Sequence, residues 1–350
     1  MRLPKTGPKN ASELPAYLEK VFQKYLDEVD HLSGDPIGMR IYSHRAKIET
    51  AGKKIVSCVK NYFGGHAYEA YLELERMLDS YLSRFVNKMI TSKDIKDSLK
   101  IIYRMRSVQN YYHLSNQEMF HVPFEMRHKL SSQRYSISGV PALYCGGSLL
   151  VCWEELKRPS FDTLHFSRIE AAQEIHLLNF GNTPKQLSYN ISPMTSALDF
   201  YEAYAVLWPL IAACSIKPTL EGQFTAEYII PNLLMQWVLR NKKCDGVRYF
   251  SVQVPLEYYN FRTKPAYLCN YAFPAKNIAE SGFCTQLMWK FKISEPLNWR
   301  MATMSQLTPA LSENQHEPIL IGKSQPVLYS TTDFWRLETY INSLKTELLF

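Results

Sequence analysis

The chain has 350 residues, of which 46% are hydrophobic and 21% charged, and its formal net charge is +7 at pH 7. This composition is typical of a globular protein and excludes an intrinsically disordered chain. The modest positive charge favours an anionic ligand or partner, but it is too diffuse to indicate a nucleic acid.

Localisation signals and cysteines point to the cytoplasm. No run of 18 apolar residues is present, so we expect no membrane-spanning helix, and the N-terminal sequence MRLPKTGPKN lacks the apolar core of a secretion signal. The seven cysteines are scattered and include no C-x-x-C pair. This pattern favours buried thiols in a reducing compartment over a disulfide framework or a zinc site, and we expect no metal.

The first part of the chain has helical periodicity. After a polar arm of residues 1–12, apolar residues recur at helical spacing from Leu14 to Val29, and two further helical stretches cover residues 41–62 and 66–89. These helices predict a separate N-terminal domain covering residues 1–95. Two roles remain open for it: a structural or dimerising role, which would make the protein a homo-oligomer, or a sensing and inhibitor-binding role.

The periodicity then changes to that of a strand. From Leu99 onward apolar residues alternate, with Tyr103 and Met105 on one face and Arg104 and Arg106 on the other. The two arginines fit either an edge strand whose charges are solvated or a clamp for an anion.

The stretch 133–155 predicts a strand, a glycine turn and a helix. Residues 140–144 suit a buried strand, Gly146 and Gly147 allow a sharp reversal, and Ser148 can cap the helix that follows. Glu154 and Glu155 are about 100° apart around that helix, so only one of the two is expected to face a cleft.

The remaining chain mixes helices and strands without regular βαβ alternation. We predict strands at 175–180, 247–254, 264–275 and 287–293, and helices at 198–214, 224–239 and 332–349. This order predicts an α+β fold. The chain contains no G-x-S-x-G, G-x-x-x-x-G-K-[ST], G-x-G-x-x-G or H-E-x-x-H motif, which removes four common enzyme classes.

Five segments carry a family resemblance. IYRMR, QRYSISGVPALYCGGSLLVCWEEL, YIIPNLLMQWV, CDGVRYFSV and NYAFPA, in this order, resemble the RES domain, which is named for an arginine, a glutamate and a serine. The resemblance covers residues 99–293. It implies an ADP-ribosyltransferase-like core, in which helices flank a mixed β-sheet, at 96–295, after the helical domain and before a C-terminal extension with a terminal helix at 296–350. Characterised members are mostly bacterial toxins of toxin–antitoxin pairs that consume NAD⁺.

The resemblance also implies which residues form the site. The family arginine, glutamate and serine fall at Arg104, Glu155 and Ser251, which are the implied catalytic residues, with Glu154 as the register alternative. The implied NAD⁺-binding residues are Arg104, Arg134, Tyr135, Tyr144 and Ser251. These residue types fit the chemistry, because an arginine fork binds phosphate oxygens and a carboxylate stabilises the oxocarbenium-like centre formed when the nicotinamide–ribose bond breaks.

Three functions follow as hypotheses. The first is a RES-domain toxin or defence effector that cleaves NAD⁺ as its substrate, with water or phosphate as acceptor, and is restrained by an antitoxin or inhibitor protein. The second is an ADP-ribosyltransferase that modifies a protein or nucleic acid. The third is a non-catalytic interaction protein that senses nucleotides.

Overall fold

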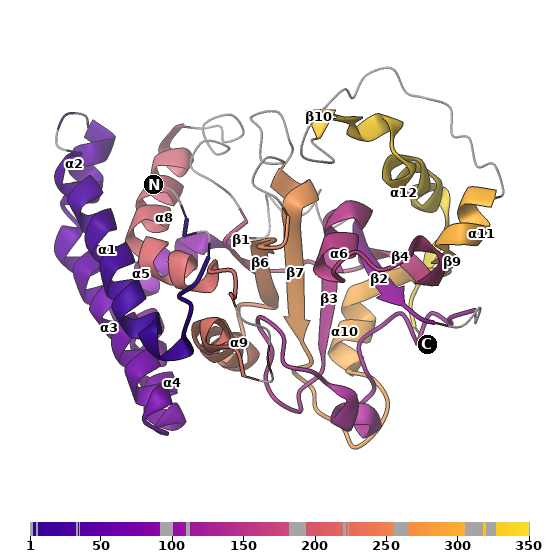
Figure 1. Cartoon of the computed structure of the whole chain (residues 1–350), viewed down its shortest axis with the longest axis horizontal. Helices are drawn as coiled ribbons and strands as arrows, with labels where there is room; N and C mark the ends of the chain where they lie inside the picture. The colour runs from indigo at the N-terminus through magenta and orange to yellow at the C-terminus, as the bar shows by residue number, and fades with distance from the viewer. Residues whose placement is uncertain are drawn as a thin grey trace. The chain divides into compact units, whose positions relative to one another are not determined.

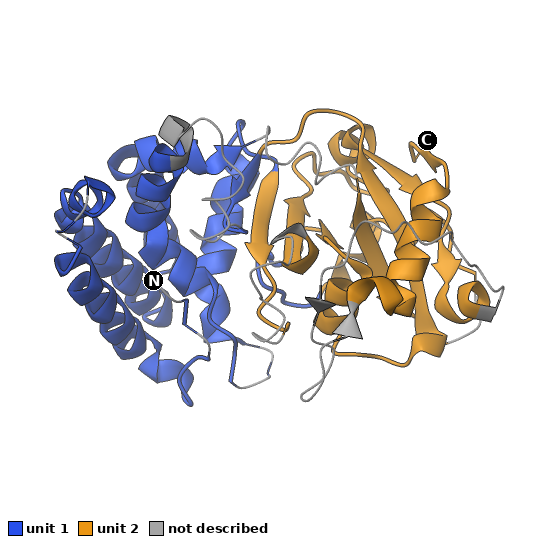
Figure 2. Cartoon of the chain, turned by 90° about the horizontal axis from the view of Figure 1, so that it is seen from above, with its two compact units in different colours: residues 1–91, 131–138, 177–245 blue, residues 92–130, 139–176, 246–350 orange. Residues whose placement is uncertain are grey.

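The computed structural model describes residues 3–4, 6–32, 34, 36–91, 101–109, 113–181, 194–219, 222, 224–254, 265–304, 318–319 and 327–349. The chain forms two compact units (Figure 2). Unit 1 comprises residues 1–91, 131–138 and 177–245, and unit 2 comprises 92–130, 139–176 and 246–350. The three contiguous domains expected from the sequence differ from these units, because segments from the middle of the chain join the N-terminal helices.

Unit 1 is mainly helical. Its described α-helices are α1 (Leu14–Asp30), α2 (Pro36–Tyr42), α3 (Arg45–Phe63), α4 (Ala67–Arg76), α5 (Ser83–Met89), α8 (Met194–Cys214) and α9 (Ile229–Arg240). A short antiparallel pair joins β1 (Ile90–Thr91) to β5 (Leu177–Asn179). The helix predicted at 66–89 is divided between α4 and α5 by a π-helical turn at Met77–Tyr81, where the Leu82 amide bonds to the Met77 carbonyl.

Helix α8 lies at the centre of unit 1. It packs against α3 and α5, and the Tyr25 ring of α1 stacks on Trp208 with ring centroids 4.0 Å apart. One buried carboxylate, Glu202, also lies on α8. Burial alone would raise the pKa of Glu202, but hydrogen bonds from Arg40 and His44 lower it to about 2. The buried charge of Glu202 is therefore compensated by partners from neighbouring helices.

Unit 2 is built on an antiparallel sheet (Figure 1). The strand order is β6-β7-β3-β2-β4-β8-β12, with β9 paired to β4. The strands are β2 (Ile102–Ser107), β3 (Ala142–Gly146), β4 (Leu164–Ala171), β6 (Gly246–Phe250), β7 (Cys269–Pro274), β8 (Phe291–Ser294), β9 (Leu297–Asn298) and β12 (Thr346–Glu347). The described strand pairs of this unit are antiparallel, and neighbouring strands come from distant parts of the sequence, so the unit is a mixed α/β structure with an antiparallel sheet, as expected for the predicted α+β class.

Short helices accompany this sheet. The α-helices are α6 (Leu149–Glu155), α10 (Thr285–Lys290), α11 (Trp299–Met304) and α12 (Asp333–Ser343), and 3₁₀ helices occur at Phe124–Lys129, Phe161–Thr163, Pro265–Leu268 and Tyr329–Thr331. A separate two-stranded sheet pairs β10 (Pro318–Ile319) with β11 (Val327–Leu328). None of the helices in the described ranges is both long and apolar enough to cross a membrane.

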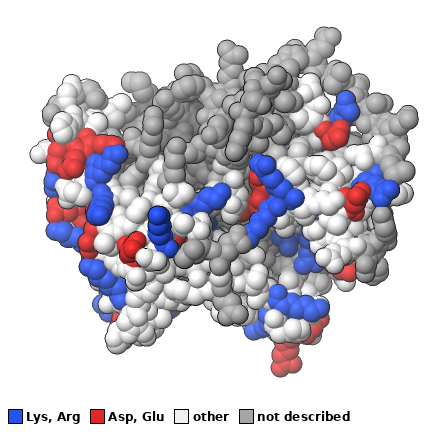
Figure 3. Space-filling view, viewed as in Figure 1, with Lys and Arg blue, Asp and Glu red and all other residues white. Residues whose placement is uncertain are grey.

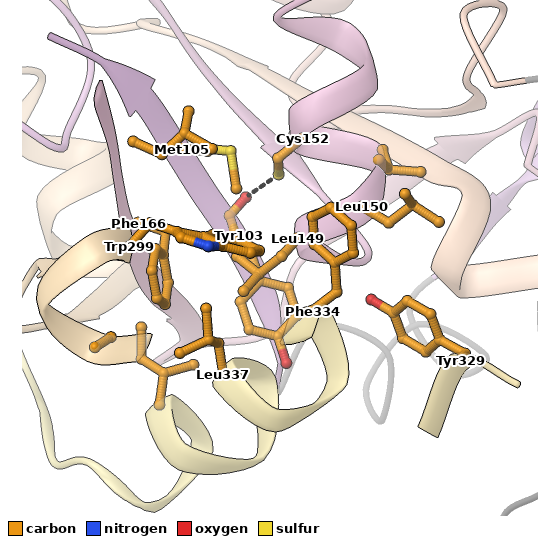
Figure 4. Close-up of a cluster of buried hydrophobic side chains, with 14 of the residues drawn as sticks. Tyr103, Met105, Leu149, Leu150, Cys152, Phe166, Trp299, Tyr329, Phe334 and Leu337 are labelled. Carbon is orange, nitrogen blue, oxygen red and sulfur yellow. Dashed lines mark hydrogen bonds between the residues drawn. The ribbon is translucent and has the colours of Figure 1, made fainter. Parts of the chain in front are cut away.

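A hydrophobic core lies between one face of this sheet and helices α6, α11 and α12 (Figure 4). Tyr103 and Met105 of β2 contribute to it, together with Leu149 of α6, Trp299 of α11 and Leu337 of α12. This confirms the predicted alternation of β2, since residues between buried ones on a strand point to the other face. Arg104 and Arg106 therefore leave β2 on the face opposite this core.

Three element predictions need correction. Strand β4 was not predicted, because its first four residues are all buried and show no alternation. The strand predicted at 287–293 begins instead with helix α10 and becomes the strand β8 only at Phe291. The C-terminal helix ends at Ser343, because Thr346 and Glu347 pair with β8. The predicted strand start at Leu99 lies outside the described residues.

Candidate functional site

Strand β3 ends at Gly146, where the backbone lies close to helix α6. A Cβ atom on Gly146 would lie 2.7 Å from the Cys152 Sγ atom, which is closer than real contacts allow. Ser148 then caps the helix, as predicted, because its Oγ atom accepts the Val151 amide at 3.1 Å and donates to the Tyr267 carbonyl. These local contacts fix where α6 begins and how its far end is directed.

The two glutamates at the end of α6 have different environments. Glu154 is buried, and both of its carboxylate oxygens accept hydrogen bonds of 2.8 Å from Arg158. Glu155 is exposed, and its Oε1 atom accepts hydrogen bonds from Ser251 Oγ and Asn270 Nδ2, both at 2.6 Å. The structure thus brings together the implied catalytic residues Glu155 and Ser251, whereas Glu154 is used in an ion pair.

The two donors that hold Glu155 are themselves fixed by the sheet. Ser251 follows β6 directly, and its Oγ atom accepts the amides of Gln253 and Val254 at 3.2 and 3.3 Å, which directs its proton to Glu155. Asn270 lies on β7 directly opposite Gly146, so no side chain on β3 separates its amide from α6. The carboxylate position is therefore set by one helix and two strands.

Sequence reasoning gave Asn270 no role. The residue lies within a family segment, NYAFPA, and in the strand Cys269–Pro274 whose six residues are all buried. A buried amide needs hydrogen-bond partners, so an asparagine in an otherwise apolar strand was the available signal.

Arg104 is half-buried and has an unusual environment for an arginine. Its Nη1 atom donates to the Tyr144 carbonyl at 2.8 Å, while its Nε atom is buried and has no hydrogen-bond partner among the described residues. Burial lowers the pKa of Arg104, and the nearby thiols of Cys145 and Cys152 partly offset this effect. Within the part of the chain that the structure describes, no carboxylate forms an ion pair with this guanidinium, and no hydrogen bond joins Arg104 to Glu155 or Ser251.

The other implied site residues divide between the units. Tyr144 lies on β3 two residues before Gly146, so its side chain leaves the same face as Asn270, and its carbonyl holds Arg104. Arg134 and Tyr135 belong to unit 1 and are both buried. Arg134 donates from Nη1 to the Cys214 carbonyl and from Nη2 to the Ile216 carbonyl at the end of α8. Their part in NAD⁺ binding stays a prediction.

Two further titratable groups lie near Arg104. Burial, together with the neighbouring Arg104 charge, lowers the pKa of Arg106 to about 10, and Arg106 donates to the Glu118 carbonyl. Burial, with the Arg104 charge adding to it, lowers the pKa of His121 to about 4, so its ring is neutral at physiological pH. The Nε2 atom of His121 accepts the Cys284 amide at 2.9 Å, so its proton is on Nδ1 and is given to the Val122 carbonyl.

Neither the face drawn in Figure 3 nor the arrangement of potential metal ligands among the described residues indicates a charged or metal-binding site. On the face drawn in Figure 3, basic and acidic side chains are interspersed. The described residues contain no cluster of three or more His, Cys, Asp or Glu side chains that could hold a metal ion. All seven cysteines lie in described segments, where each is buried and forms no disulfide.

Comparison with known proteins identifies one relative over nearly the whole chain. A protein of Bacillus subtilis (strain 168) named "Putative toxin YopC" is 32% identical over 346 residues, which cover 94% of this chain and 76% of the relative. No protein-family model matches the chain, and no solved structure matches it. The extent of this similarity shows that the chain belongs to the same family as the Bacillus subtilis protein.

Proposed function

We propose that this protein is a toxin that cleaves the nicotinamide–ribose bond of NAD⁺, with Glu155 as the carboxylate that stabilises the sugar cation. The observation that carries the proposal is the exposed carboxylate of Glu155, held by 2.6 Å hydrogen bonds from Ser251 and Asn270. The similarity to a relative named as a toxin supports the biological role. The five RES-like segments support NAD⁺ as the substrate. They also support the proposal that the sheet of unit 2 belongs to an ADP-ribosyltransferase-like fold.

The position of Glu155 suits cleavage of the nicotinamide–ribose bond, and this reaction needs no general acid. Breaking the nicotinamide–ribose bond leaves positive charge on the ribose, and a carboxylate that is already oriented stabilises that charge without reorganising. Nicotinamide leaves as a neutral base, so no general acid is required at its nitrogen. The neutral His121 therefore needs no catalytic role.

Arg104 supplies a cation that could bind the phosphates of NAD⁺. An arginine stays charged at physiological pH, and its planar fork matches phosphate oxygens. In the described ranges Arg104 has only the Tyr144 carbonyl as a hydrogen-bond acceptor, so its charge is not balanced by a carboxylate. A diphosphate would supply that balance.

The test compares two adjacent glutamates. Purified wild-type protein, Glu155→Gln and Glu154→Gln are incubated with NAD⁺, and released nicotinamide is quantified by chromatography. We expect Glu155→Gln to lower the rate at least about 100-fold, as for the loss of an electrostatic stabiliser. Glu154→Gln keeps an acceptor for Arg158, so its rate should stay within about tenfold of wild type. Full activity of Glu155→Gln would refute the catalytic assignment.

The same reagents separate the alternative functions. If labelled NAD⁺ leaves label on a protein or nucleic acid in a lysate, the enzyme transfers ADP-ribose rather than releasing it. If calorimetry detects NAD⁺ binding but no nicotinamide is released, the protein is a nucleotide sensor. Growth arrest on expression in bacteria, relieved by Glu155→Gln, would link the chemistry to toxicity.

A further inference from the structure

Ser167 lies directly across the sheet from Arg104. The register of β2 and β4 pairs Arg104 with Ser167, and the next pair along the strands is Arg106 with His165. Residues opposed in an antiparallel pair point to the same face, with Cβ atoms about 4.5–5.5 Å apart. Ser167 has no solvent exposure. The guanidinium of Arg104 and the hydroxyl of Ser167 therefore start from neighbouring positions on one face.

Both residues have a buried polar atom that lacks a partner. Neither Arg104 Nε nor Ser167 Oγ has a hydrogen bond within the described structure. Buried polar groups in native proteins are almost always hydrogen-bonded, so two such atoms in one opposed pair require an explanation. The two atoms are also complementary, because the Nε–H group of arginine can only donate and the serine oxygen can accept.

The neighbouring contacts explain why the two atoms are apart. Arg104 Nη1 donates to the Tyr144 carbonyl on β3, which is the strand on the other side of β2 from β4. This bond draws the guanidinium toward β3 and away from Ser167. In the adjacent pair, Arg106 donates to the Glu118 carbonyl and His165 Nε2 lies 3.2 Å from Asn298 Nδ2.

We propose that Ser167 positions Arg104 for ligand binding. A rotation of the Arg104 side chain brings Nε–H to Ser167 Oγ and releases Nη1 from the Tyr144 carbonyl. The two Nη groups then form a fork that can bind two oxygens of one phosphate group. The identity of the ligand as the NAD⁺ diphosphate rests on the proposed function, whereas the contact between Arg104 and Ser167 does not.

Binding measurements with a rescue variant test this proposal. NAD⁺ affinity is measured by calorimetry in a Glu155→Gln background, so that no substrate is consumed. We expect Ser167→Ala to raise Kd about tenfold, which is typical for losing one hydrogen bond to a charged group. Ser167→Thr keeps the hydroxyl and suits a strand, so it should restore Kd to within about threefold of the parent. A Kd unchanged by Ser167→Ala, or equally weak binding by the alanine and threonine variants, would overturn the proposal.

A second measurement remains informative if NAD⁺ is not the ligand. Arginine side chains are labelled with ¹⁵N, and the Arg104 Nε–H signal is assigned by its loss in Arg104→Lys. Inorganic pyrophosphate is then the probe. It should slow hydrogen exchange at Arg104 Nε–H in the wild-type protein and in Ser167→Thr, but not in Ser167→Ala. Slowed exchange with pyrophosphate but no NAD⁺ binding would reject the proposed function alone, and an equal response in Ser167→Ala would reject the positioning role.

Discussion

A buried carboxyl group of unit 2 should make the stability of the protein depend on pH. Glu338 of α12 is 3% exposed, and its Oε1 atom accepts the Leu149 amide at 2.6 Å and the Tyr329 hydroxyl at 2.5 Å. Burial raises the pKa of Glu338 from its usual 4.5 to about 8, although both hydrogen bonds act in the opposite direction. The carboxyl group is thus protonated in the folded protein at neutral pH and ionised in the unfolded chain.

The sign and size of the effect follow from linkage. Below pH 4.5 Glu338 is protonated in both states, so its contribution to stability is fully present. As the pH rises toward 8, the unfolded chain loses the proton first, and the free energy of unfolding falls by about 1.4 kcal/mol per pH unit. Between pH 6 and 8 the loss from this residue is about 2 kcal/mol, because the slope decreases near the folded-state pKa.

Urea unfolding of Glu338→Gln measures this contribution. Glutamine keeps an oxygen for the Leu149 and Tyr329 donors but does not titrate. We therefore expect the wild type to lose about 2 kcal/mol more than Glu338→Gln between pH 6 and 8. Glu347→Gln is the matched control, since it removes an exposed carboxylate from the same C-terminal segment and should keep the wild-type slope. Parallel profiles for wild type and Glu338→Gln would refute the reasoning.

Four other outcomes test the structure itself. Gly146→Ala should lower the free energy of unfolding by about 1–3 kcal/mol, because its Cβ would meet Cys152 Sγ at 2.7 Å, and a further Cys152→Ala change should recover part of that loss in the same urea assay. Ser148→Ala should cost about 1 kcal/mol in urea unfolding through the lost helix cap. Arg134→Met should cost about 3 kcal/mol because two carbonyls at the end of α8 lose their donor, and an unchanged urea midpoint would contradict this role. The His121 ring signals in NMR should not titrate between pH 8 and 5, because its pKa is lowered to about 4.

The parts of the fold that sequence could predict are those with local signals. The alternation of β2 and the cap of α6 depend on residues within one or two turns of each other, and both are observed. Strand β4 carries no such signal, because His165 and Ser167 are buried polar residues among buried apolar ones. The change from helix α10 to strand β8 could not be predicted for a different reason. The alternating polarity of residues 287–293 indicated a strand throughout, but the exposed Trp289 lies on α10.

The candidate site shows the same limit over longer distances. The Glu155–Ser251 hydrogen bond joins residues 96 positions apart, and the family segments, rather than any periodicity, suggested that pair. The hydrogen bond from Asn270 spans 115 positions and depends on the register of β3 and β7, which places Asn270 opposite a glycine. Register is a tertiary property, so the sequence pattern of β7 could not reveal which residue would reach the carboxylate.

The ion pairs of unit 2 support the proposal that Arg104 binds an anionic ligand. Glu154 is buried but is paired with Arg158, and Arg168 bonds to Glu170 at 2.6 Å. Each of these charges has a partner of opposite sign, which offsets part of the free energy needed to remove it from water. The guanidinium of Arg104 has a single carbonyl acceptor among the described residues, and its Nε atom has none. A desolvated cation without a carboxylate partner retains a cost that an anionic ligand would offset. The lysine variant Arg104→Lys keeps the charge but loses the fork, so it should weaken NAD⁺ binding at least about tenfold in the Glu155→Gln background. Equal affinity of Arg104→Lys and the parent would show that the guanidinium does not hold the ligand.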